Sequence, residues 1–515
     1  MALDTRSPRL GLWLLLLGCL FVCAPTTYPG YWQSQEGFVP VFNAVHSGNI
    51  ASLATTPDLW RGTGRSAFLL AQPLMLLGAT PVAAVRATFA LALLLGGLGV
   101  YAWLHPRLGD RTAGLAGLVY LLLPPILATV YVRGSLGDAL IIGLLPLALA
   151  GLASYSEGRS LTAAAVVVLS VLWMWRSQAG LALFATLLLI AYAAFVERSR
   201  LAVLVATLSG AAGLASLLPL WSIQGPSPAN FADHFVNVTQ LLVGSWQPTP
   251  GSSTWQTEPS QLGFAASVLS LLALWLWVRR VGTPNSDMIG RLLRFAGIGT
   301  LVMLLLSLNL MAPLWSTTGM ERLLTYPWQV LLLACPLLAV MAGSLPSLNT
   351  YLQRVPLWLT LVGLVFLGSY PYLHADFTQV NPPTTPVATF GQHPDLVLLQ
   401  ANVSENQATG EASLDVTWQV LHPLPFDYNV FFQAVTQEND ETEIVAQVDT
   451  QPRQGREPAT SWEPGQILTD TYQLELPNPL PEGELRYFYG YYDWRDGTRL
   501  PVDGGIDDKL ILYGE

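Results

Sequence analysis

The chain has 515 residues, of which 52% are hydrophobic and only 11% are charged. Soluble globular proteins carry roughly 25% charged residues, so this deficit and the long apolar runs exclude an ordinary soluble protein and indicate many membrane spans. The net charge of −10 lies in the tail, because residues 1–375 carry 18 arginines and 11 acidic residues, whereas residues 376–515 carry six basic and 23 acidic residues; so acidic a tail argues against nucleic acid as a partner.

The apolar segments predict a mainly α-helical membrane protein with about eleven transmembrane helices and a C-terminal all-β sandwich domain. The expected domains are a multi-span membrane domain at 1–375, a linker at 376–394 and an extracytoplasmic β-domain at 395–515. The three cysteines all lie in the membrane domain, so no disulfide holds the tail. The spans are expected at about 10–25, 81–104, 112–130, 136–154, 160–175, 179–196, 200–221, 261–279, 295–312, 326–344 and 356–373.

The first span has two other interpretations. Arg6 and Arg9 before a short apolar core also fit a cleaved signal peptide, and "LLGC" at Leu16–Cys19 faintly matches a lipoprotein cleavage site. Arginine counts set the orientation: with the N-terminus inside, 12 arginines fall on inner loops and six at or near the outer side. The chain is therefore expected in the cell membrane as a multi-pass protein, with a cytoplasmic N-terminus and an extracytoplasmic tail.

A carboxylate follows the first span, in the stretch Gly30–Ile50. A short helix is expected to begin near Phe38–Pro40, since proline is tolerated in a first turn. Glu36 is then either an acid that complements the helix dipole or a general base for an incoming hydroxyl group. We expect His46 at the membrane interface rather than as a ligand. An apolar stripe is expected to lie on the membrane: Phe38, Val41, Phe42 and Val45.

Three further groups of polar residues fall on the expected outer side. Arg61 and Arg65, in "DLWRGTGRS", suit either a phosphate or a lipid headgroup. Arg133 and Asp138, in "YVRGSLGDAL", form either an ion pair across a turn or the lining of a pocket for a charged ligand. Glu321 and Arg322 precede a late span, where the arginine either binds a lipid phosphate or anchors the helix end. A short apolar segment at 66–78 is expected to be interfacial or re-entrant.

The tail alternates apolar and polar residues with a period of two, which is typical of strands with one buried face. Four such stretches are "ASLDVTWQVL", "YNVFFQAV", "ILTDTYQLEL" and "LRYFYGYYD". About seven short strands are expected, in an antiparallel sandwich. Four aromatic side chains are candidates for stacking on sugar rings, although most of them fit a core better: Trp418, Trp462, Tyr491 and Trp494.

The pattern resembles the GT-C superfamily of membrane glycosyltransferases, whose members carry an acid just after the first span. The stretch "YVRGSLGDALIIGLLPLAL" at Tyr131–Leu149 is similar to 6-pyruvoyl-tetrahydropterin-synthase-related membrane proteins. In the tail, "YNVFFQAV" and "GYYDWRDGTRLPV" resemble the C-terminal β-domain of bacterial protein-mannosyltransferase-like glycosyltransferases. These similarities cover about 10–345 and 395–515.

The resemblance implies transfer of a sugar from a polyprenyl-phosphate donor lipid to a glycan, lipid or protein acceptor outside the cytoplasm, with inversion. Glu36 would be the base, and an arginine would stabilise the phosphate, with Arg322 the first candidate and Arg133 and Arg61 after it. Related proteins often have arginine where this sequence has Gln329. A divalent cation at Glu36 is the one cofactor considered, although a lone acid is a poor metal site. The alternative function is a non-catalytic scaffold or transport-associated protein for cell-envelope polysaccharide.

Overall fold

A computed structural model describes residues 9–32, 34–46, 65–217, 231–242, 261–279, 287–373, 375, 377–378, 386–391, 394–406, 410–438, 441–479, 483–503 and 508–513. The chain divides into two compact units. The helical unit comprises Met1–Tyr28, His46–Trp246 and Thr257–Ala375, and the C-terminal unit comprises Pro29–Val45, Gln247–Gln256 and Asp376–Glu515.

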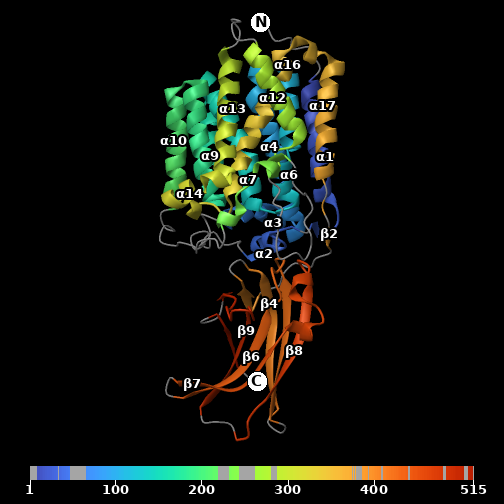
Figure 1. The fold of residues 1–515 in the computed structure, drawn as a ribbon, viewed down its shortest axis with the longest axis vertical. Helices are drawn as coiled ribbons and strands as arrows, with labels where there is room; N and C mark the ends of the chain where they lie inside the picture. Colours follow the sequence, from blue (N-terminus) through green and yellow to red (C-terminus); the bar gives the residue numbers. More distant parts are fainter. Residues whose placement is uncertain are drawn as a thin grey trace. The chain divides into compact units, whose positions relative to one another are not determined.

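The helical unit is a bundle of apolar helices (Figure 1). Among the described residues, six helical segments are long and apolar enough to cross a membrane, or seven if the bent pair α5 and α6 is one span. Four shorter apolar helices, α8, α10, α12 and α17, accompany them. Each of the eleven ranges expected to span thus contains a helix. The helices are α1 (Leu10–Cys23), α3 (Gln72–Leu76), α4 (Pro81–Leu108), α5 (Asp110–Leu121), α6 (Pro124–Tyr131), α7 (Leu136–Gly158), α8 (Leu161–Ser177), α9 (Ala179–Tyr192), α10 (Arg200–Ala215), α11 (Val238–Leu242), α12 (Phe264–Arg279), α13 (Asp287–Ser307), α14 (Ala312–Thr318), α15 (Leu331–Gly343), α16 (Leu345–Leu348) and α17 (Val355–Ser369).

A proline and a glycine set the helix break and the turn that position Arg133 and Asp138. Pro124 begins α6 and follows a break after α5, and the two helices meet at 46°. At the other end of α6, Gly134 adopts a positive φ of 68°. The chain can therefore reverse within a few residues and start α7 at Leu136. This tight turn holds Arg133 and Asp138 at one end of the helical unit.

Close approach of helix backbones depends on glycine at the α4–α7 interface. A Cβ on Gly143 would lie 2.7 Å from the carbonyl oxygen of Ala92, and one on Gly99 would lie 2.9 Å from the amide nitrogen of Leu147. Small residues permit such contacts between helices, and in a membrane this packing replaces the hydrophobic effect as the force of association.

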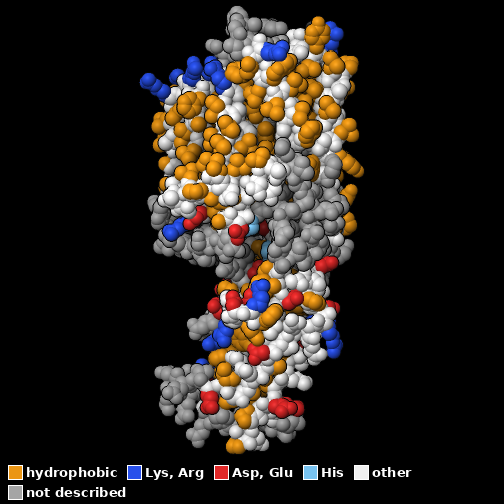
Figure 2. Space-filling view, in the orientation of Figure 1, with side chains coloured by type: hydrophobic (Ala, Val, Ile, Leu, Met, Phe, Trp, Pro, Cys, Tyr) orange, Lys and Arg blue, Asp and Glu red, His pale blue; other side chains and the backbone are white. Residues whose placement is uncertain are grey.

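Arginines gather at the opposite end of the helical unit (Figure 2). Arg107, at the end of α4, donates from Nη1 to Glu197 at 2.6 Å and to the hydroxyl of Tyr192 at 2.8 Å. Its Nε donates to Glu157 at 2.9 Å. Because Arg107 and Glu197 are both mostly buried, their charges stabilise the fold only as a pair.

The C-terminal unit contains two larger antiparallel sheets, which confirms the predicted β tail. One sheet has the order β10-β3-β4-β5-β8 and the other the order β11-β9-β6-β7, and a third, two-stranded sheet pairs β1 with β2. One short helix, α2 (Val39–His46), belongs to this part of the chain. The strands are β1 (Tyr31–Trp32), β2 (Phe377–Thr378), β3 (Ala388–Phe390), β4 (Leu396–Asn406), β5 (Glu411–Val420), β6 (Asn429–Glu438), β7 (Glu441–Thr450), β8 (Ile467–Glu475), β9 (Glu484–Tyr492), β10 (Val502–Asp503) and β11 (Leu510–Leu512).

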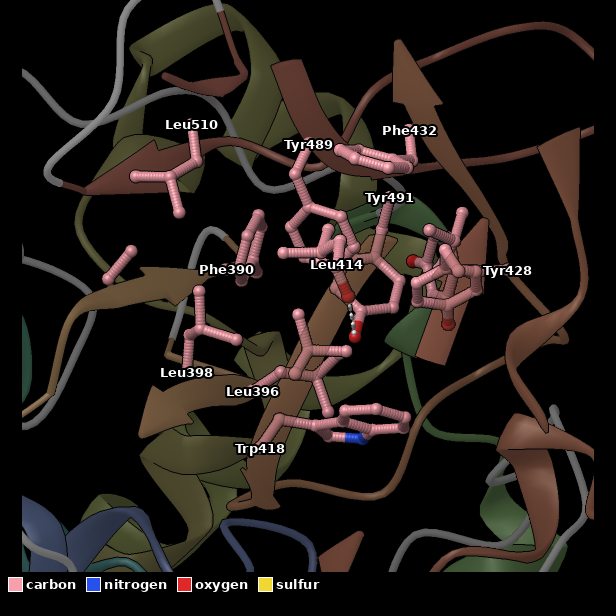
Figure 3. Packing of buried hydrophobic residues seen from close by; sticks show 14 of the residues in the cluster. Phe390, Leu396, Leu398, Leu414, Trp418, Tyr428, Phe432, Tyr489, Tyr491 and Leu510 are labelled. Atoms are coloured by element: carbon pink, nitrogen blue, oxygen red, sulfur yellow. Dashed lines mark hydrogen bonds between the residues drawn. The ribbon is translucent and has the colours of Figure 1, made fainter. Parts of the chain in front are cut away.

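Aromatic side chains from both larger sheets meet in one hydrophobic core (Figure 3). Phe390 of β3 contacts Tyr489 and Tyr491 of β9 edge to face, with ring centroids 5.9 and 5.0 Å apart. The Tyr489 hydroxyl donates to the Tyr491 hydroxyl at 2.9 Å, so these buried phenols satisfy one another. Trp418 and Trp462 also lie in this core. Of the four aromatic side chains considered for sugar stacking, Trp494 is exposed and the other three are buried.

The observed units differ from the expected domains in two places. Strand β3 lies inside the range 376–394, which was expected to be a linker, and pairs with β4. The segment Pro29–Val45 groups with the C-terminal unit rather than with the helices. The second difference arises from the pairing of β1 with β2, two strands that are distant in sequence, which side-chain periodicity does not report.

Gly143→Ala should destabilise the helical unit by about 1–3 kcal/mol, since the added methyl group meets backbone that has no room to move. Gly363→Ala, in α17, is the matched control because an added Cβ there has nothing within 4 Å. Thermal unfolding of the two variants in detergent, followed by loss of the monodisperse peak, measures the difference. Equal midpoints would show that the α4–α7 contact is not tight.

Candidate functional site

An ion pair is buried at the junction of α6 and α7. Arg133 Nη1 donates to Asp138 Oδ2, and the two side chains are 5% and 1% exposed. The backbone of the turn fixes both residues: the Arg133 amide donates to the Ala128 carbonyl at 2.8 Å, and Asp138 lies in the first turn of α7. An acid in that position also complements the helix dipole.

A glutamine that is distant in sequence forms a hydrogen bond with the acid of this ion pair. Gln329 lies in the 3₁₀ turn η9 (Pro327–Val330), which leads into α15. Its Nε2 donates to Asp138 Oδ2 at 2.8 Å, while its Oε1 accepts from the amides of Thr325 and Tyr326, each at 3.1 Å. Gln329 is 1% exposed. It therefore orients the Asp138 carboxylate and ties η9 to the start of α7.

Aromatic rings lie against the guanidinium. Arg133 Cζ lies 4.7 Å from the ring centroid of Trp328 and 5.6 Å from that of Tyr326. These two rings stack with centroids 5.3 Å apart and an interplanar angle of 10°. His234, at the end of the 3₁₀ turn η6 (Phe231–His234), meets Tyr326 at 4.8 Å. Cation–π contacts of this kind are worth about 2 kcal/mol when desolvated. Together, the polar cluster comprises Arg133, Asp138, His234, Tyr326, Trp328 and Gln329.

Two polar atoms of the cluster have no hydrogen-bond partner among the residues that the structure describes. They are Asp138 Oδ1, an acceptor, and Trp328 Nε1, a donor, and both are buried. A buried polar group without a partner costs about 1–3 kcal/mol. Unpaired buried atoms in a native protein need an explanation. A bound ligand that donates to Asp138 Oδ1 and accepts from Trp328 Nε1 would provide one.

Of the predicted site residues, Arg133 and Asp138 come together, and they do so as an ion pair, one of the two arrangements expected for them. Arg322 is exposed and Glu321 half-buried, in the 3₁₀ turn η8 (Met320–Arg322). Arg65 starts the 3₁₀ turn η3 (Arg65–Leu70), while Arg61 lies outside the described residues. Four members of the cluster were not among the predicted site residues: His234, Tyr326, Trp328 and Gln329.

Glu36 belongs to the C-terminal unit and is half-buried. The helix that follows begins at Val39 with Pro40 in its first turn, as predicted. The expected membrane-lying stripe is wrong as stated, since Phe38, Val41 and Phe42 are at most 7% exposed and so face protein. Within the described ranges, His, Cys, Asp and Glu side chains do not gather in groups of three or more that could hold a metal ion.

A scan against known protein families and a search of curated proteins found no match to the chain.

Arg133→Leu should destabilise the helical unit by about 3–5 kcal/mol, because it leaves the Asp138 carboxylate buried without its counter-charge. The double variant Arg133→Leu/Asp138→Leu buries no charge and should recover much of the loss. Thermal midpoints in detergent compare the two. A double variant as unstable as the single one would show that the pair contributes through packing rather than charge.

Proposed function

We propose that this chain is a GT-C-type membrane glycosyltransferase that moves a sugar from a polyprenyl-phosphate donor to an extracytoplasmic glycan, lipid or protein acceptor. The observation that supports this proposal most is the polar cluster around Arg133, buried at one end of the helical unit. Buried ionisable groups among apolar helices are costly and mark functional sites.

The chemistry of the cluster fits the polar head of such a donor. A guanidinium carries five N–H donors in a planar fork, so Arg133 can contact a phosphate while it remains paired with Asp138. Asp138 Oδ1 could accept from a sugar hydroxyl, and Trp328 Nε1 could donate to one. The stacked faces of Tyr326 and Trp328 suit a sugar ring or an isoprenoid chain.

The proposed architecture has eleven spans and a β-sandwich. The four shorter apolar helices coincide with predicted spans, and we propose that they also cross the membrane. The arginine-rich end of the helical unit would then be cytoplasmic, and the polar cluster would be at the outer side. The shared core of the two larger sheets supports the sandwich, which we place outside the cell membrane.

The proposed reaction needs one base and one anion-stabilising group. The Glu36 carboxylate takes the proton of the acceptor hydroxyl as its oxygen bonds to the anomeric carbon. The bond from that carbon to the phosphate oxygen breaks with inversion, and the phosphate leaves with the electron pair. Arg133 is the first candidate to stabilise this charge, ahead of Arg322, because the Arg133 side chain is buried whereas Arg322 is exposed to solvent, which weakens its electrostatic effect. The leaving phosphate is stable as an anion, so the step needs no general acid.

Mass spectrometry of the lipids that co-purify with the detergent-solubilised protein tests this proposal. Enrichment of a polyprenyl-phosphate sugar is expected in the wild type and should fall at least tenfold in Arg133→Lys, which keeps the charge but loses the planar fork. Arg322→Ala is the matched control and should retain the lipid. If the lipid were lost in Arg322→Ala but retained in Arg133→Lys, the phosphate would bind at Arg322 and not at Arg133. Bulk phospholipid in every sample would favour the non-catalytic scaffold.

Glu36→Gln separates an enzyme from a scaffold. The substitution removes the base but keeps the size of the side chain, so transfer should fall by about 10²–10⁴-fold while the donor lipid still co-purifies. Transfer is measured in native membrane vesicles as the rate at which the endogenous lipid-linked sugar is lost. A variant that turns the lipid over at the wild-type rate would remove Glu36 from the mechanism.

A further inference from the structure

The turn that carries Glu36 is attached to the C-terminal unit, although it follows the first helix in sequence. Strand β1 pairs antiparallel with β2, so that Tyr31 lies opposite Thr378 and Trp32 opposite Phe377. The Tyr31 ring contacts Phe38 edge to face, with centroids 6.0 Å apart. The segment is therefore held by backbone pairing before the turn and by ring packing after it.

A glycine allows the turn itself to close against the C-terminal unit. The Gly37 amide donates to the Ser34 carbonyl at 3.0 Å, and Gly37 has a φ of 51°. The next amide, of Phe38, donates to the carbonyl of Leu421, just after β5. A Cβ on Gly37 would overlap that carbonyl and would lie 3.0 Å from the Cα of His422. Glycine is required here on two grounds, the left-handed backbone and the close approach.

Residues Leu421 and His422 form a corner that is itself braced. Both of their amides donate to the Asp395 carbonyl, at 2.8 and 3.2 Å, and the Asp395 amide donates to Phe390 at 2.8 Å. Asp395 Oδ1 lies 3.4 Å from His422 Nδ1. Burial raises the pKa of the Asp395 carboxyl to about 8.

We propose that the corner Leu421–His422 is a positioning element for Glu36, and that Gly37 is the residue through which it acts. The corner fixes the turn and so presents the carboxylate in one orientation to the acceptor hydroxyl. This inference rests on the proposed function, in which Glu36 is the base. A displacement of about 1 Å in such a group costs on the order of 10²-fold in rate.

The test compares Gly37→Ala with Gly497→Ala. Gly497 also has a positive φ, of 78°, but an added Cβ there has nothing within 4 Å, so the control carries the backbone strain without the overlap. Hydrogen–deuterium exchange of the full chain in detergent reports on residues 34–42 directly. In Gly37→Ala, protection of 34–42 should fall at least tenfold while residues 411–420 of β5 keep theirs, which shows that the sheet remains folded.

Transfer in native membrane vesicles is the second measurement. In Gly37→Ala, kcat should fall on the order of 10²-fold with KM for the endogenous donor unchanged, whereas Gly497→Ala should match the wild type. Unchanged exchange at 34–42 would overturn the inference whatever the activity. Faster exchange at 34–42 with transfer at the wild-type rate would also overturn it. The transfer rate of Glu36→Gln tests the proposed function separately, because that rate does not depend on how the turn is held.

Discussion

A buried charge must meet an opposite charge, and at Arg133 this requirement joins distant parts of the chain. Its partner Asp138 lies five residues on, but the carboxylate is oriented by Gln329, 191 residues farther along the sequence. The aromatic rings over the guanidinium come from the same turn as Gln329, and His234 adds a third segment. The break at Pro124, the reversal at Gly134 and the start of α15 all serve to bring these groups to one end of the bundle.

Elsewhere in the described part of the bundle, some buried polar groups bond to a neighbouring helix, as Trp175 does to Thr186 and Ser270 to the Leu338 carbonyl. Several buried hydroxyls donate instead to carbonyls of their own helix: Thr88 to Ala84, Thr186 to Ala182 and Ser209 to Val205. A transporter is expected to place polar side chains near the middle of its spans, where the substrate binds. The cluster around Arg133 lies instead at one end of the helical unit.

The C-terminal unit is more than an appended tail, because it includes the segment that follows the first helix. Backbone pairing of β1 with β2 and the hydrogen bond from Phe38 to Leu421 attach that segment to the sheets. Removal of the tail would therefore also remove the partners of the turn that carries Glu36.

The sequence alone indicated the apolar helices, the β-rich tail and the charge split, because hydrophobic periodicity and composition act locally. It also predicted a helix start near Val39 and offered the pairing of Arg133 with Asp138 as one of two alternatives, because both depend on spacing within a few residues. Only the tertiary structure decided that Gln329 binds Asp138 and which residues surround Glu36. Gln329 reads as one more polar residue before a span until the fold brings it to Asp138. Likewise, the apolar residues after Glu36 have the same pattern whether they face lipid or protein, and only their burial distinguished the two.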